Sequence, residues 1–289
     1  MLLNCGVCAV KLWPLVTTAF NDWLRHRCAR LGAALAYYAV FSLGPLLLIV
    51  TAVAGIFFGA EAVRGSLASQ FTGLLGSNGG KAIDAMIEGA ASASAGYAAA
   101  GIGFVLLIAA ALGVVVQMKD ALNTIWEVED PQDSGWWWYV RTYVISFAGI
   151  LALGMLMTVT LVLSAGITAF GGWMGIPPAE NLLWQAVNLV LSLTVLTISF
   201  GLLFKYFPDA PVAWRDVWVG AAVTAILFDA GKIGIATYIG MQGLESTYGA
   251  ASSFVVLLIW IYYASQIVLF GAELTHVRAI QRRPHVQVK

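Results

Sequence analysis

Long uncharged runs alternate with short charged segments along this chain. Five runs contain no Asp, Glu, Lys or Arg: Leu31–Ala60, Gly89–Met118, Thr142–Ala179, Asn181–Phe204 and Ser246–Ala272. Each is longer than the roughly 20 residues that a helix needs to cross about 30 Å of hydrocarbon. The pattern therefore predicts five transmembrane helices.

A sixth segment, Val217–Gly240, is equally apolar except for Asp229 and Lys232. The run that begins at Thr142 is long enough for two helices. However, the glycines at 171 and 172 and the prolines at 177 and 178 indicate a loop in its last part. We therefore expect an all-α, polytopic membrane helix bundle of about six transmembrane helices. The approximate spans are 31–60, 97–118, 142–170, 182–204, 217–240 and 252–273.

Amphipathic segments flank the predicted spans. Before the first span, apolar residues recur at helical spacing, which is typical of an interfacial helix; they are Leu12, Val16, Phe20, Trp23 and Leu24. A second stripe follows the first span at Val63, Leu67 and Phe71. The expected organisation is a cytoplasmic interfacial segment at 1–30, a transmembrane domain at 31–277 with an extracytoplasmic amphipathic insert at 61–96, and a basic cytoplasmic tail at 278–289.

The distribution of Lys and Arg predicts the orientation. With six spans, the tails and the even-numbered loops share one side, and twelve of the fifteen basic residues lie there. The other side holds only Arg64 and Lys81, and Lys232 is inside a span. Because basic residues mark the cytoplasmic side, both termini are expected in the cytoplasm.

Composition agrees with a lipid environment and excludes several function classes. The chain is 60% hydrophobic and 10% charged, its net charge is zero, and its mean hydropathy is +0.85. Membrane lipids are the expected partners, a homo-oligomer is compatible, and no nucleic acid partner is expected because there is no basic excess. No phosphate-binding loop, dinucleotide fingerprint or nucleophile elbow occurs, so no cofactor is expected.

The cysteines and histidines do not predict a metal site. Cys5 and Cys8 have the spacing of a metal or redox half-site, but only His26 and Cys28 lie near them in the sequence. A structural zinc site needs four ligands, so three free thiols are the favoured interpretation. We expect no metal.

The pair Asp229 and Lys232 is the main candidate for a functional site. Ionisable residues inside a span are costly and often functional. The spacing of three residues places the carboxylate and the ammonium on one helix face. Two interpretations remain open: a structural ion pair, and a substrate, ion or proton site.

Two further spans carry polar stripes. Tyr262, Gln266 and Glu273 share one face of the last span. In the first span, Tyr38 and Ser42 precede Gly44 and Pro45, where a proline kink is expected. Gln117 and Asp120 share a face at the cytoplasmic end of the second span. These residues complete the set of candidates for a substrate or ion pathway.

The chain resembles a known family over nearly its whole length. The motifs that carry the resemblance are Ala33-Ala-Leu-Ala-Tyr-Tyr-Ala-Val-Phe-Ser-Leu-Gly-Pro45, Gln117-Met-Lys-Asp-Ala-Leu-Asn-Thr-Ile-Trp126, Pro208-Asp-Ala-Pro-Val-Ala-Trp-Arg-Asp-Val-Trp218, Gly231-Lys232, Tyr248-Gly-Ala-Ala, Trp260-Ile-Tyr-Tyr-Ala-Ser-Gln266 and Gly271-Ala-Glu-Leu-Thr275. They are similar to the YihY/BrkB family of bacterial inner-membrane proteins, some of which carry the older label ribonuclease BN. The resemblance implies a bacterial inner (plasma) membrane protein with six spans, and it supplies no chemistry.

Three functions follow as hypotheses. A transporter, or a translocator of lipids or envelope components, would use the polar faces around a cavity, and we favour it. A non-catalytic envelope scaffold is the alternative. A ribonuclease would need a basic RNA groove and a metal or acid–base cluster, and the acidic residues Glu127, Glu129, Asp130 and Asp133 would repel RNA. The sequence therefore favours a protein that is not an enzyme.

Overall fold

The structure is a computed structural model that describes residues 12–69, 72, 80, 84–85, 88, 113–128, 182–242 and 252–282. The described residues form helices joined by turns, with no strand among them, which confirms the all-α prediction for this part of the chain. The named helices are α1 (Leu12–Arg25), α2 (Cys28–Phe58), α6 (Leu182–Tyr206), α7 (Trp214–Gln242) and α9 (Ser252–Arg282). Residues 60–69 and 113–125 are also helical.

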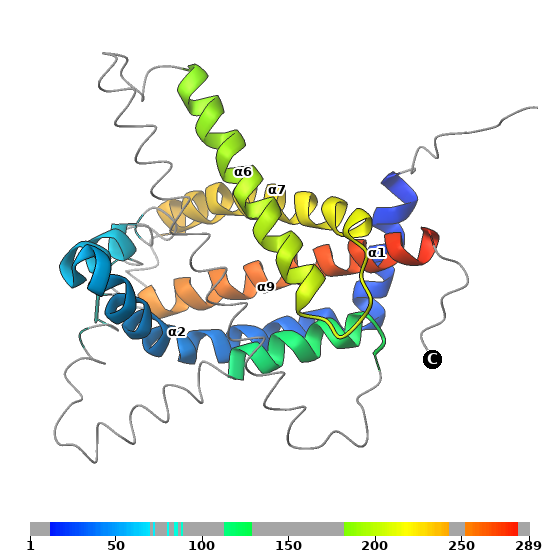
Figure 1. Cartoon of the computed structure of the whole chain (residues 1–289), viewed down its shortest axis with the longest axis horizontal. Helices are drawn as coiled ribbons and strands as arrows, with labels where there is room; N and C mark the ends of the chain where they lie inside the picture. Colours follow the sequence, from blue (N-terminus) through cyan, green and yellow to red (C-terminus); the bar gives the residue numbers. More distant parts are fainter. Residues whose placement is uncertain are drawn as a thin grey trace, which may run out of the picture.

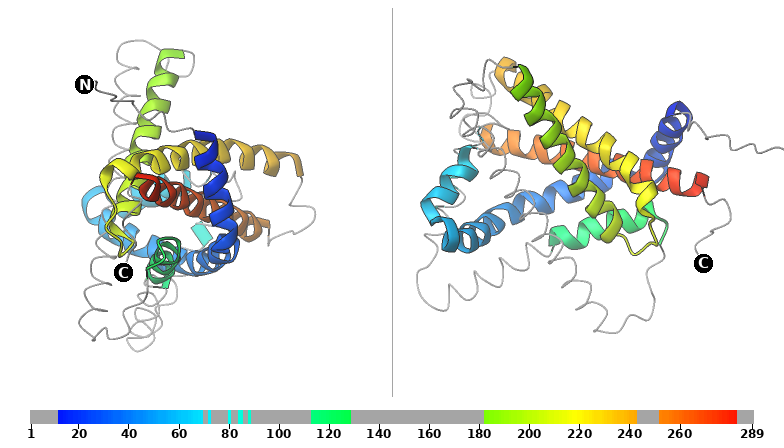
Figure 2. Two further views of the ribbon diagram at one scale, coloured as in Figure 1. Left: turned by 90° about the vertical axis from the view of Figure 1, so that its right-hand side faces the viewer. Right: turned by 45° about the horizontal axis from the view of Figure 1, so that its top comes forward.

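Helix α9 is the central element. It contacts α7, α2, α1 and α6, and α6 also packs along α7. In Figure 1, α9 lies between α7 and α2, while α1 crosses α9 near the C-terminal end of α9. The second view of Figure 2 shows α6 crossing α7 obliquely. A side chain on α9 can therefore meet groups from most of the described helices.

Small residues allow α7 and α9 to approach closely. A Cβ added at Gly220 of α7 would clash with the carbonyl oxygen of Gly271 on α9. A Cβ added at Gly271 would in turn clash with the side chain of Thr224 on α7. Such small residues at a helix contact are typical of membrane bundles, where close backbone packing holds helices together.

Helix α1 packs on the C-terminal part of α9. Leu15 and Ala19 form a buried cluster with Leu274 and Val277 of α9. Other apolar side chains of α1 stay exposed on its remaining faces: Trp13, Phe20 and Leu24. The helix thus presents apolar groups both to the bundle and to the outside.

Two of the described helices contain stretches long and apolar enough to cross a bilayer: Leu189–Tyr206 in α6 and Phe254–Arg282 in α9. Cys28–Leu43 of α2 is a shorter apolar stretch. Most of the predicted spans 97–118 and 142–170 lies outside the described residues. Six spans therefore remain a prediction. Among the described helices, α6 and α9 contain stretches with the length and composition of a span.

The helices do not end where the predicted spans end. Helix α9 continues from residue 273 to Arg282, and α7 begins at Trp214 rather than at 217. The predicted bounds stop at charged residues, but a charged residue ends only the apolar stretch and not the helical hydrogen bonding. As a result, Glu273 lies inside a helix and not at its end.

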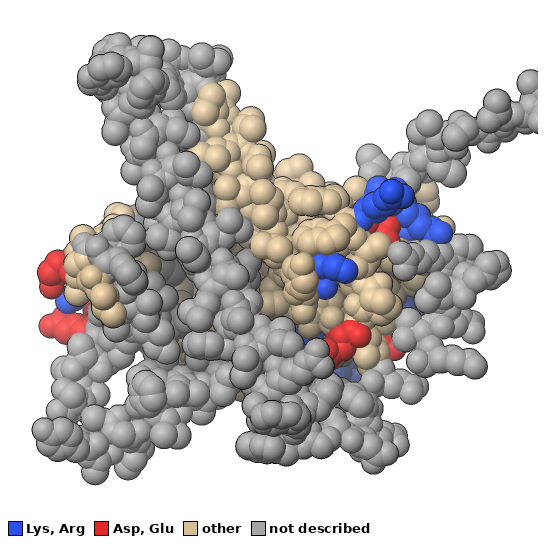
Figure 3. All heavy atoms as spheres, in the orientation of Figure 1, with Lys and Arg blue, Asp and Glu red and all other residues tan. Residues whose placement is uncertain are grey.

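Charged side chains gather toward the ends of the molecule. On the face shown in Figure 3, Lys, Arg, Asp and Glu cluster mainly at the right and at the far left, with tan atoms over much of the described surface between them. Exposed apolar side chains on the described helices include Val190, Ile198, Ile226, Leu258 and Ile259. This pattern suits a bundle whose sides face hydrocarbon.

Candidate functional site

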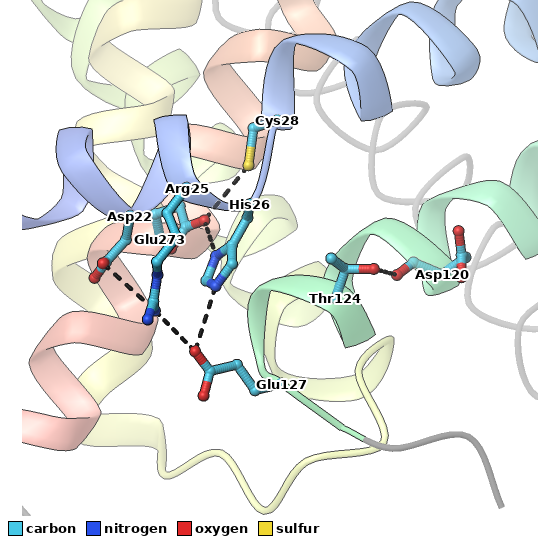
Figure 4. Close-up of polar contacts among 8 residues, drawn as sticks. All are labelled: Asp22, Arg25, His26, Cys28, Asp120, Thr124, Glu127 and Glu273. Carbon is cyan, nitrogen blue, oxygen red and sulfur yellow. Dashed lines mark hydrogen bonds and ion pairs between the residues drawn. The ribbon is translucent and has the colours of Figure 1, made fainter.

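The sharp turn between α1 and α2 positions His26. Arg27 adopts the left-handed conformation, with φ 53° and ψ 42°, and the backbone N–H of His26 donates to the carbonyl of Asp22 at 2.8 Å. The turn directs the His26 ring toward α9, as Figure 4 shows. A non-glycine residue in this conformation is uncommon and indicates that the surrounding packing fixes the turn.

The buried carboxylate of Glu273 meets two side chains from this turn. Its Oε1 atom lies 2.7 Å from Nδ1 of His26 and 3.4 Å from Sγ of Cys28, whose thiol donates (Figure 4). The side chain of Glu273 is completely buried, and that of His26 is 9% exposed. A buried carboxylate needs such partners because removing it from water is costly.

The other ring nitrogen of His26 faces a second carboxylate. Nε2 of His26 lies 3.4 Å from Oε1 of Glu127, and the same oxygen accepts from Arg25 at 2.8 Å. Glu127 follows the 113–125 helix and is itself left-handed, with φ 51°. We call His26, Glu273, Glu127, Arg25 and Cys28 the polar-end cluster. It joins the α1–α2 turn, the end of the 113–125 helix and α9.

The two carboxylates favour the charged form of His26. The hydrogen bond and charge of Glu273 raise the pKa of His26 above its usual value, and Glu127 adds to this effect. Burial and the neighbouring Arg25 act in the opposite direction. With both ring nitrogens protonated, Nδ1–H donates to Glu273 and Nε2–H points toward Glu127.

Several buried polar atoms beside the cluster lack partners. Among the described residues, Oε2 of Glu273, Nδ1 of His276 and Nε1 of Trp126 have no hydrogen-bond partner. The His276 ring lies 5.0 Å from the Trp126 ring and 6.5 Å from the His26 ring, measured between centroids. Unsatisfied buried polar atoms are rare and costly, so a concentration of them beside Glu273 points to a site that binds or exchanges a small polar species or a proton.

A second polar centre lies within α7. Asp229 and Lys232 form an ion pair, and their side chains are 18% and 28% exposed. Among the described residues, no hydrogen bond or ion pair links this pair to Gln266 or Glu273. The structure therefore separates the sequence candidates into two centres, one on α7 and one at the polar end.

The predicted stripe on α9 is divided between different environments. Gln266 packs over Gly32 of α2 and its Nε2 lies 3.4 Å from the carbonyl of Ala29. Tyr262 is partly exposed, whereas its neighbour Tyr263 turns inward and donates to the carbonyl of Leu227 at 3.3 Å. Gln266 and Glu273 thus both face the start of α2, and Tyr262 does not join them.

The candidates on the first two predicted spans lie as follows. Tyr38 packs against Gly113 of the neighbouring helical segment, and Ser42 donates to the carbonyl of Ala39 at 3.1 Å. Gln117 lies in the same segment as Asp120, whose carbonyl accepts from Thr124 at 2.9 Å (Figure 4). Helix α2 runs through Gly44 and Pro45, and the kink expected there remains a prediction. Cys5 and Cys8 lie outside the described residues.

Sequence patterns do not identify the contacts of His26 with Glu273 and with Glu127. His26 and Glu273 are 247 positions apart, so no local spacing connects them. One signal was present, namely that His26 and Cys28 lie just before the first predicted span and Glu273 lies at the end of the last one, which the charge distribution predicts to be on the same side. The described residues contain no group of three or more His, Cys, Asp or Glu suited to holding a metal ion.

Comparison with known proteins places the chain in a family. The family model described as virulence factor BrkB matches residues 19–288. The chain is 29% identical over 275 residues to the UPF0761 membrane protein of Verminephrobacter eiseniae, covering 91% of this chain and 62% of that protein. It is 37% identical over 174 residues to the UPF0761 membrane protein YihY of Salmonella typhimurium, covering 58% of this chain and 56% of that protein.

These curated relatives are longer than this chain. For example, the match to the UPF0761 membrane protein of Stenotrophomonas maltophilia covers 93% of this chain but 62% of that protein. No solved structure matches the chain. The family match spans far more than half of the chain and agrees with the motifs found in the sequence, so this protein belongs to the BrkB family, whose relatives are named membrane proteins.

Proposed function

We propose that this protein is a multi-pass inner-membrane translocator with six spans and both termini in the cytoplasm, and that it moves a charged solute or a lipid-like envelope component. The transmembrane domain covers 31–277, with the polar-end cluster on the cytoplasmic side. The observation that carries the proposal is the Asp229–Lys232 pair, which lies on a helix of the bundle and stays partly accessible.

An aromatic group near the start of α7 supports a central depth for this pair in the bilayer. Tyr206, Trp214 and Trp218 are exposed, and their rings contact one another in sequence at 6.0 Å and 5.8 Å. Exposed Trp and Tyr mark the membrane interface. At 1.5 Å per residue, Asp229 lies about 16 Å beyond Trp218 along α7. This distance is about half the thickness of a hydrocarbon core of about 30 Å.

An ion pair at this depth is costly, which favours a functional reason for its presence. A carboxylate and an ammonium can exchange their mutual contact for contacts with a substrate that carries both charges, or release one charge to a substrate that carries the opposite one. Their partial exposure leaves room for this exchange, because protein does not enclose either charged group completely. The alternative is an envelope scaffold in which the pair serves packing only.

The test compares purified wild-type protein with Asp229→Asn and Lys232→Met in liposomes. The probes are a fluorescent phospholipid, whose movement between leaflets is followed with a quencher, and entrapped rubidium ions, whose efflux is followed directly. Asp209→Asn is the matched control, because it removes the charge that pairs with Lys119 at 2.9 Å without touching α7. Thermal unfolding of each variant reports folding.

The proposal expects wild-type protein and Asp209→Asn to move at least one probe, and both α7 variants to fold but to lose about tenfold or more of that activity. Equal activity in all four proteins would contradict the role of the pair. Unfolding of both α7 variants, together with no movement of either probe by wild-type protein, would favour the scaffold.

A further inference from the structure

The polar-end cluster forms a graded path from water to the buried carboxyl group. Glu127 is 55% exposed, His26 is 9% exposed and Glu273 is fully buried. One nitrogen of His26 faces each carboxylate, at 3.4 Å from Glu127 and 2.7 Å from Glu273 (Figure 4). An imidazole that is bound at both nitrogens can accept a proton on one side and release one on the other.

We propose that His26 relays protons between the exposed carboxylate of Glu127 and the buried carboxyl group of Glu273, so that Glu273 is a proton-loading site of this protein. The use of the loaded proton as the coupling ion rests on the function proposed above. The relay itself does not depend on that function.

The transfer balances at each atom. The O–H bond of the protonated Glu127 carboxyl group breaks and its proton bonds to Nε2 of His26, which gives a Glu127 carboxylate and a His26 imidazolium. The Nδ1–H bond then breaks, and that proton bonds to Oε1 of Glu273, leaving a neutral imidazole and a neutral carboxyl group. Exchange of the ring tautomer, or the reverse transfer, returns His26 to its starting form, and no oxidant, reductant or further reactant takes part.

The surroundings of Glu273 allow it to hold a proton. Its Oε2 has no partner in the described structure, and a neutral carboxyl group is less costly to bury than a carboxylate. The titratable and charged groups around His26 and Glu273 come from each neighbouring element: Asp22 and Arg25 of α1, Cys28 of α2, Glu127 after the 113–125 helix, and His276 of α9. The carboxylates favour imidazolium on His26, whereas Arg25 disfavours it, which keeps the proton exchangeable.

Infrared difference spectroscopy tests the relay in purified full-length protein in lipid nanodiscs. A protonated buried carboxyl group gives a distinct carbonyl band that shifts in heavy water. We expect this band in wild-type protein after a downward pH step and its absence in Glu273→Gln. After a rapid pH step, the carbonyl band should appear at least about tenfold more slowly in His26→Gln than in wild type. Protonation of Glu273 should also be slower in Glu127→Gln, and it should proceed at the wild-type rate in Asp209→Asn.

Glu127 is exposed, so Glu127→Gln keeps the test decisive even if His26→Gln fails to fold. The relay would be overturned if Glu273 became protonated at the wild-type rate in folded His26→Gln and Glu127→Gln. It would also be overturned if no carbonyl band of Glu273 appeared across the pH range. A band that behaves as expected in a protein that moves neither lipid nor rubidium would support the relay and count against the proposed translocator.

Discussion

Nδ1 of His26 lies 2.7 Å from Oε1 of Glu273, although 247 positions separate the two residues in the chain. The contact fixes the turn between α1 and α2 against the central helix of the bundle. Because Glu273 is completely buried, the pair is shielded from the salt and water that weaken surface ion pairs. Its removal should therefore have effects that can be measured both in the titration of His26 and in the stability of the fold.

Replacement of Glu273 by glutamine should lower the pKa of His26 toward its usual value. Glutamine keeps the shape of the side chain and can still accept from Nδ1, but it removes the charge that favours the imidazolium. The expected cost is about 1–3 kcal/mol of unfolding free energy, as for a buried hydrogen bond to a charged group. Histidine NMR of protein labelled at the imidazole measures the pKa, and an unchanged His26 titration would contradict this assignment.

The stability of the protein should depend on pH through His26. Its pKa is raised in the folded state by Glu273, so the stabilising contribution is fully present below the unfolded-state pKa of about 6.5. That contribution is lost as the pH rises through the higher folded-state pKa. Thermal unfolding in detergent should therefore show a melting temperature that falls as the pH increases across this window.

His26→Gln provides the control for the pH dependence. The variant should lose the part of the slope that lies in the window of His26, and Glu273→Gln should lose most of it as well. A slope that persists unchanged in both variants would show that other groups are responsible.

Substitution of Gly220 by alanine should disrupt the contact between α7 and α9. The added methyl group would meet the carbonyl oxygen of Gly271, and a backbone atom cannot move aside as a flexible side chain can. We expect a loss of about 1–3 kcal/mol. Gly234 is the matched control, because an added Cβ there meets nothing within 4 Å, and Gly234→Ala should be neutral or stabilising by about 0.5–1 kcal/mol.

Thermal unfolding of the two glycine variants side by side separates packing from helix propensity. If Gly220→Ala melts at or above the temperature of Gly234→Ala, α7 and α9 do not approach in the way described.

The all-helical architecture could be predicted from the sequence because long uncharged runs have few other stable forms in lipid. The candidate site could be predicted only in part. Asp229 and Lys232 are three residues apart on one helix, so their contact follows from helical periodicity. The contact between His26 and Glu273 depends on how α1, α2 and α9 pack together, and no periodicity within one helix contains that information.

Helix ends were harder to predict than helix positions. The charge pattern predicts that the last span ends at Glu273, whereas α9 continues to Arg282. The buried position of Glu273 became evident only with α1 packed across this part of α9. Charge therefore bounds the apolar stretch of a predicted span, and it gives no information on which charged groups other helices cover.

The proposed orientation predicts which charged positions can be labelled from each side of the membrane. In a variant with all three cysteines replaced by serine, Asp209→Cys should react with an impermeant maleimide only after the cells are opened. Glu88→Cys, next to Arg64 at the other end of the molecule, should react in intact spheroplasts. The reverse labelling pattern would contradict cytoplasmic termini.

The depth of α7 in the bilayer tests the central claim most directly. Ile226 is exposed and lies one turn before Asp229, so a spin label at Ile226→Cys in the cysteine-free protein reports the depth of that turn. Power-saturation measurements in liposomes compare its access to oxygen, which concentrates in the bilayer, and to a water-soluble nickel complex. We predict high access to oxygen, low access to nickel and a depth near the bilayer centre. High access to nickel, with a depth at or outside the headgroups, would show that α7 does not carry its ion pair through the membrane.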